Sequence, residues 1–149
     1  MKSSPSLHPN VLLVDDNQDG LLVRRALLEE QGFQVAIASN GEEGLKLFKE
    51  GHFDVVVTDY RMPVMTGIEL IRKIRELKPL LPVVLLSGLV EPLGLNEQNT
   101  GADAVIAKNS NEAGHLVRWV RRLLNRTSAR KPVASQRRTL VRARASSSY

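Results

Sequence analysis

Five polar side chains of complementary chemistry stand where apolar runs of this sequence end. Asp15 and Asp16 follow the run "VLLV", and Asp59 follows "VVVT". Ser87 and Lys108 close two later apolar runs. Three acids, one hydroxyl and one amine in equivalent positions are typical of a site that handles a cation and an anion together.

The residue types narrow the chemistry further. Three carboxylates in one place repel one another and raise one another's pKa unless a cation offsets their charge. Mg²⁺, or Mn²⁺ in its place, prefers oxygen ligands and commonly bridges carboxylates to a phosphate. Lys108 suits a phosphoryl group, Ser87 can donate a hydrogen bond to it, and an aspartate can be the nucleophile that receives it. The sequence therefore predicts a Mg²⁺-dependent aspartyl-phosphate site.

These side chains can meet only if the elements before them are parallel strands, because ligands bind at the carboxyl ends of such strands. Apolar runs alternate with stretches of helical periodicity, and the runs are too apolar to be half exposed. This pattern predicts an α/β fold with a doubly wound, five-stranded parallel sheet. The expected strands are 11–14, 34–38, 54–58, 82–87 and 104–108, and the expected helices are 21–31, 41–50, 67–77 and 112–126, with 89–101 as the weakest helix.

Three of the expected helices carry a start signal. Asn40, Thr66 and Asn109 each stand three residues before a glutamate, which is the spacing of a capping box. We expect each of these side chains to cap the helix that follows it.

Composition and charge divide the chain in two. It has 149 residues, no cysteine, and no apolar stretch of signal-peptide or membrane-span length, so we expect a cytoplasmic protein. Residues 126–149 carry seven Arg or Lys and no acid, which leaves residues 1–125 with a net charge of −2. We expect one domain over 9–125 and a basic, disordered tail over 126–149.

At this level of detail the sequence resembles the receiver domain of two-component response regulators. The strongest element is the stretch 59–67, "DYRMPVMTG", which matches the family pattern D-x-x-M-P-x-M-x-G. "VDD" at 14–16, Ser87 with Gly88, and Lys108 add to it. The resemblance implies a flavodoxin-like (βα)5 fold with strand order 2-1-3-4-5.

The resemblance also implies a role for each residue. Asp59 would accept a phosphoryl group from a phosphohistidine of a sensor histidine kinase or a histidine phosphotransfer protein. Lys108 would contact the phosphate and Asp59, and Ser87 would move toward the phosphate. The protein would be a signalling phosphoacceptor rather than an enzyme, acting on an unknown downstream protein. The implied Mg²⁺ ligands are Asp15, Asp16, Asp59 and the backbone carbonyl of Arg61.

Two positions depart from the family pattern. Val105 stands where an aromatic ring usually swings inward, and Asn109 stands where a proline usually forms a cis bond with the lysine. A cis bond before a residue other than proline costs about 2.5–4 kcal/mol. We therefore expect either a trans Lys108–Asn109 bond or a strained cis bond, and an altered readout of the phosphorylated state.

Other functions stay open at this point. A pseudo-receiver would bind partners without phosphorylation. The two departures keep this alternative open, whereas the complete set of acids and the lysine argue against it. A Mg²⁺ phosphatase of the haloacid-dehalogenase type needs a D-x-D-x-T motif, but Arg61 takes the place of its second acid. The basic tail could solubilise the chain, link it to another domain, or contact nucleic acid through phosphates.

Overall fold

The computed structural model describes residues 8–88 and 93–130. Five parallel strands form one sheet in the order β2-β1-β3-β4-β5. This confirms the doubly wound α/β fold and the strand order predicted above. The strands are β1 (Asn10–Val14), β2 (Gln34–Ala38), β3 (Val55–Asp59), β4 (Val83–Ser87) and β5 (Ala104–Ala107).

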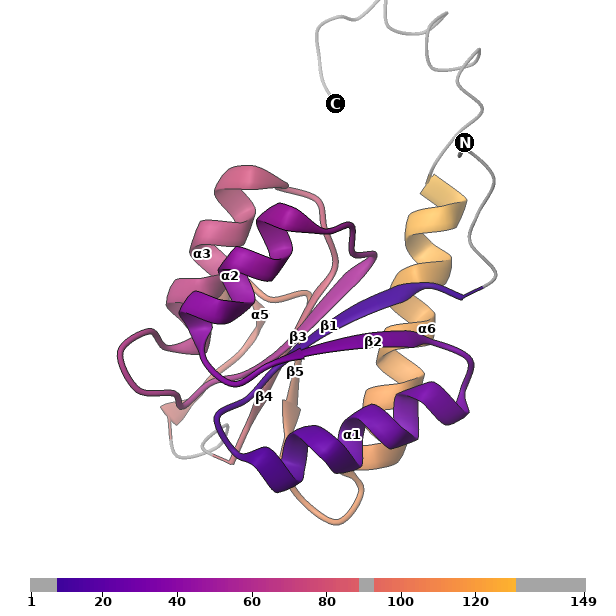
Figure 1. The fold of residues 1–149 in the computed structure, drawn as a ribbon, viewed down its shortest axis with the longest axis horizontal. Coiled ribbons are helices and arrows are strands. Elements are labelled where there is room, and N and C mark those ends of the chain that lie inside the picture. Colours follow the sequence, from indigo (N-terminus) through magenta and orange to yellow (C-terminus); the bar gives the residue numbers. More distant parts are fainter. Residues whose placement is uncertain (1–7, 89–92, 131–149) are drawn as a thin grey trace, which may run out of the picture.

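Helices cover both faces of the sheet. Figure 1 shows α1 and α6 on one face, and α2 and α3 on the other. Within the weakly predicted stretch 89–101, Glu97–Thr100 form the short helix α5, and residues 89–92 lie outside the described part of the chain. The helices are α1 (Gln18–Glu30), α2 (Gly41–Glu50), α3 (Gly67–Leu77), α5 (Glu97–Thr100) and α6 (Glu112–Arg130).

Alternating strand residues divide the core into two layers. Successive side chains of a strand point to opposite faces, so Leu13 and Val57 pack under α1 and α6, whereas Val14 and Val56 pack under α2 and α3. All four are fully buried. Burial on both faces explains why the strands read as continuous apolar runs.

The helix starts agree with the capping prediction in two places out of three. Thr66 and the glutamate at N3 of α3 form a complete capping box, and the Asn40 side chain accepts a hydrogen bond at the start of α2. Asn109 differs, because its side chain accepts from the backbone N–H of Asn111. The prediction that Asn109 forms a capping box with Glu112 is wrong, since the Glu112 carboxylate turns to α1 instead.

The exit from β5 is regular in its peptide geometry. No cis peptide bond occurs in the described residues, so the Lys108–Asn109 bond is trans. Beyond it, α6 continues to Arg130, so the helix is longer than the predicted 112–126, and residues 127–130, expected to lie in the tail, are helical. The rest of the predicted tail, 131–149, lies outside the described residues, and none of the described helices is long and apolar enough to span a bilayer.

Candidate functional site

The three predicted acids meet at one edge of the sheet. Asp15 directly follows β1, Asp59 is the last residue of β3, and the two strands pair with Val14 opposite Thr58. One carboxylate oxygen from each of Asp15, Asp16 and Asp59 lies within 4.8 Å of the others. Two chain segments, the ends of β1 and β3, therefore bring three acids to one point, as the sequence predicted.

The acids differ in their contact with solvent. Asp15 is 1% exposed and Asp59 is 5% exposed, whereas Asp16 is exposed at the rim. Burial raises the pKa of Asp59 above its ordinary value, and the nearby Asp15 charge raises it further. The hydrogen bond and charge of Lys108 oppose this rise without cancelling it. Asp59 is thus a buried carboxylate in a strongly charged environment.

Lys108 supplies the cation that faces both buried acids. Its Nζ lies 2.5 Å from Oδ1 of Asp59 and 3.8 Å from Oδ2 of Asp15. The backbone N–H of Lys108 donates to the Ser87 carbonyl at 2.9 Å, which fixes the backbone of the lysine beside the end of β4. The ammonium thus lies beside both buried carboxylates and offsets part of their charge.

The donor set fits a hard divalent cation. Three carboxylates with one exposed member provide oxygen ligands and leave one side for water, as Mg²⁺ requires. Asp15, Asp16 and Asp59 would hold the ion. Arg61 is exposed in the loop after β3, and the role of its backbone carbonyl as a further ligand stays a prediction.

Ser87 and Val105 lie on the side of the sheet away from α1. Ser87 ends β4, is 2% exposed, and pairs with Ala107 of β5. Val105 is half-buried against the core layer under α2 and α3, and its N–H donates to the Glu97 carboxylate of α5 at 3.3 Å. Val105 therefore packs as an ordinary aliphatic residue.

The loop between Asp59 and α3 closes tightly under the site. The N–H of Gly67 donates to the Tyr60 carbonyl at 2.8 Å, and a Cβ on Gly67 would overlap the Asp59 carbonyl oxygen. Val64 in the same loop has φ = 71°, an outlier for a β-branched residue. The loop thus places backbone directly against the residue that carries the candidate chemistry.

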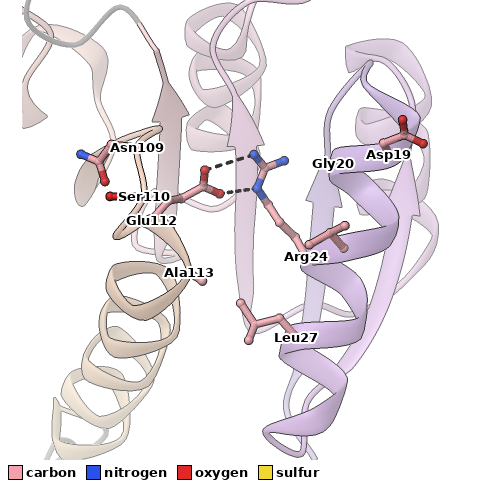
Figure 2. A pocket seen from close by; sticks show the side chains of 9 residues that line it. Asp19, Gly20, Arg24, Leu27, Asn109, Ser110, Glu112 and Ala113 are labelled. Atoms are coloured by element: carbon pink, nitrogen blue, oxygen red, sulfur yellow. Dashed lines mark hydrogen bonds and ion pairs between the residues drawn. The ribbon is translucent and has the colours of Figure 1, made fainter.

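Sequence reasoning missed a second cation at the site, Arg24. Its Nη1 lies 2.7 Å from Oδ2 of Asp15, and its Nε lies 2.5 Å from Oε2 of Glu112. Figure 2 shows the Arg24–Glu112 pair spanning the space between α1 and the start of α6. A signal was present, because Arg24 stands three residues after Leu21 and four before Leu28, both of which are buried.

Replacing Asp59 by asparagine should stabilise the metal-free protein by about 1 kcal/mol at neutral pH, because it removes a buried, repelled charge. The raised pKa of Asp59 means that the folded protein binds more protons than the unfolded chain between the ordinary and the raised values. Stability therefore falls as pH rises through that window, and the advantage of the variant grows with it.

Urea denaturation in chelator at several pH values from 4 to 8 tests this expectation. The difference between variant and wild type should be largest at neutral pH and shrink as the pH falls through the raised pKa of Asp59 toward its ordinary value. A variant less stable at neutral pH, or a difference independent of pH, would contradict it.

Comparison with known proteins gives the family. A family model described as the response regulator receiver domain matches residues 11–121. The chain is 36% identical over 102 residues to the aerobic respiration control sensor protein ArcB of Escherichia coli (strain K12), covering 66% of this chain and 13% of ArcB. It is 39% identical over 80 residues to the autoinducer 1 sensor kinase/phosphatase LuxN of Vibrio harveyi, covering 54% of this chain and 9% of LuxN. The chain thus spans only a small part of these curated relatives.

Solved structures of receiver domains and response regulators superimpose on this fold. A receiver domain protein from Clostridium thermocellum superimposes with a TM-score of 0.73 at 30% identity, covering 81% of this chain and 98% of that one. The response regulator TrrA from Thermotoga maritima, solved in complex with Mg²⁺-BeF, gives 0.70 at 30% identity, covering 77% and 98%. With its fold, its strand-end acids and the match over most of its length, the chain belongs to the response regulator receiver domain family.

Proposed function

We propose that the protein is a phosphorylation-switched signalling domain that accepts a phosphoryl group on Asp59. The donor is a phosphohistidine of a sensor histidine kinase or a histidine phosphotransfer protein, and the reaction depends on Mg²⁺ or Mn²⁺. The observation that carries the proposal is a buried Asp59 carboxylate held 2.5 Å from Lys108 Nζ and beside two further acids. The Mg²⁺ named for the complex of TrrA supports the metal.

The transfer needs little covalent chemistry from the protein. A carboxylate oxygen of Asp59 forms the new P–O bond while the P–N bond of the phosphohistidine breaks, and the departing imidazole nitrogen keeps the electron pair and takes a proton. Lys108 stabilises negative charge on the transferred group, and Ser87 offers it a hydroxyl hydrogen bond. A bound Mg²⁺ would neutralise the crowded carboxylates and orient the phosphate oxygens.

We propose that phosphorylation changes the surface of the protein and that no small-molecule product is released for a downstream step. We propose that the protein signals by contact with a downstream protein, that it is not an enzyme beyond slow hydrolysis of its own aspartyl phosphate, and that it works in the cytoplasm. Contact of the tail with nucleic acid stays a prediction. The family match gives no support to the haloacid-dehalogenase alternative.

Intact mass after incubation with a small phosphodonor tests the proposal. In a Mg²⁺ titration the wild type should gain one phosphoryl group, and Asp59→Asn should gain none. Asp54→Asn is a matched control, because Asp54 directly precedes β3 at the opposite end of the same strand. It should react like the wild type. A wild type without added mass, or an Asp59→Asn variant that gains as much, would end the proposal.

One observation favours the pseudo-receiver as a second candidate. The Arg24 guanidinium already neutralises Asp15 from inside the protein, so the acids are partly compensated without a metal. A protein that binds partners but takes up neither Mg²⁺ nor phosphoryl groups in the same titration would be this second candidate.

A further inference from the structure

Arg24 joins the candidate metal site to the first turn of α6. One guanidinium serves two acids, with Nη1 at 2.7 Å from Asp15 Oδ2, Nε at 2.5 Å from Glu112 Oε2 and Nη2 at 3.3 Å from Glu112 Oε1. The Arg24 and Glu112 side chains are only 12% and 15% exposed, so solvent screens this pair weakly. Figure 2 shows that the pair bridges the pocket between the two helices.

The surroundings leave room for this arrangement. A Cβ on Gly20 would come 2.7 Å from Arg24 Nη1 and 3.4 Å from Asp15 Oδ2, so the absence of a side chain at Gly20 lets the two groups meet. The other Asp15 oxygen, Oδ1, accepts from the N–H of Asn17 at 2.9 Å. Both oxygens of Asp15 are therefore already engaged by the protein's own donors.

A metal ligand held this way cannot serve the metal and the guanidinium equally. A divalent cation and Arg24 are both positive, and both seek the carboxylate of Asp15. We propose that Arg24 is a positioning residue that competes with the divalent cation for Asp15, and that Glu112 sets the outcome by drawing the guanidinium toward α6. This inference rests on the proposed function, since it assumes that Asp15 is a metal ligand.

The competition has a consequence for signalling. Metal binding weakens the Arg24–Asp15 contact and leaves the guanidinium to Glu112, and by reciprocity a change at Glu112 alters metal affinity. This connection runs on the α1 and α6 side of the sheet. Ser87 and Val105 lie toward the other side, where Val105 has no ring to swing.

Three variants and their Mg²⁺ affinities, measured by calorimetry, test the proposal. Arg24→Met should bind Mg²⁺ about 5-fold more tightly, because the competitor is gone. Glu112→Gln should bind about 3-fold more weakly, because the guanidinium then rests on Asp15 alone. The double variant should match Arg24→Met, since Glu112 acts only through the arginine.

The double variant distinguishes this relay, in which Glu112 acts on the metal site only through Arg24, from two charges that act on the metal site independently. Independent charges would give additive changes, and additivity would overturn the proposal, as would an Arg24→Met affinity equal to or weaker than that of the wild type. Arg75→Met is the matched control. Arg75 forms an ion pair with Asp103, with 2.9 Å between the charged atoms, and this pair is not part of the candidate metal site. The Arg75→Met variant should therefore leave the Mg²⁺ affinity unchanged.

A measurement on the wild type covers the case in which Arg24→Met does not fold. The ¹⁵N–¹H signal of Arg24 Nε should shift on saturation with Mg²⁺, while that of Arg75 stays. An Arg24 signal unmoved by bound Mg²⁺ would overturn the relay. Failure of the proposed function differs from both outcomes, because there the wild type would bind no Mg²⁺ and gain no phosphoryl mass.

Discussion

Lys108→Met should slow the phosphorylation of Asp59 by about 100-fold, because it removes the charged donor that lies against the Asp59 carboxylate. Methionine keeps a similar length of apolar stem, so the packing around β5 is largely preserved. The same change removes a positive charge 2.5 Å from Asp59 and 3.8 Å from Asp15. Mg²⁺ should therefore bind more tightly to the variant even though the variant reacts more slowly.

Opposite changes in affinity and rate distinguish this prediction from damage to the fold. Calorimetry gives the Mg²⁺ affinity, and a time course of intact mass with a small phosphodonor gives the rate. Lys46→Met, an exposed position on α2, provides the control and should change neither value. A Lys108→Met rate close to that of the wild type would remove the lysine from the mechanism.

Gly67→Ala should lower the free energy of unfolding by about 3 kcal/mol, because the new Cβ has no room. It would overlap the Asp59 carbonyl oxygen, and it would lie 2.9 Å from Leu85 Cδ1 and 3.0 Å from Tyr60 Cα. Two of these three neighbours are backbone atoms, which cannot rotate away. We expect the loop to move outward and to carry the end of β3 with it.

Urea denaturation compares this variant with Gly114→Ala. Gly114 lies in α6, where a Cβ would find only Arg118 Nη2 at 3.9 Å. The same change there should stabilise the protein by about 0.5–1 kcal/mol, since alanine favours the helix. If Gly67→Ala unfolds at the urea concentration of the wild type, the tight approach at Asp59 is not a constraint.

Much of the fold follows from local signals. The predicted bounds of α2 and α3 agree with the structure because each helix follows a cap, and α2 also ends at a glycine, Gly51. The positions of Asp15, Asp59 and Lys108 follow from strand ends, because parallel strands bring their carboxyl ends to one edge. The sequence therefore predicted which edge of the sheet carries the site and which residues lie on it. The roles of these residues stay predictions.

The rest depends on contacts that no local pattern contains. Arg24 and Glu112 are 88 residues apart, and each reads as an ordinary charge on a helix until the fold brings them together. The same long-range contact explains why the predicted capping box between Asn109 and Glu112 does not form, since the Glu112 carboxylate binds Arg24 instead. The helical residues 127–130 were missed because their polar composition resembled that of the Ser/Arg-rich tail that follows.

Helix α6 is long enough to transmit a displacement from one of its ends to the other as a rigid rod. Leu116, Val120 and Leu123 hold its middle against the sheet, which makes Val120 a natural pivot. At 1.5 Å per residue, the arm toward Glu112 is about 12 Å long and the arm toward Arg130 about 15 Å. If α6 turns as a rigid rod about Val120, we expect a sideways displacement of Glu112 to move Arg130 in the opposite direction by a distance about a quarter larger.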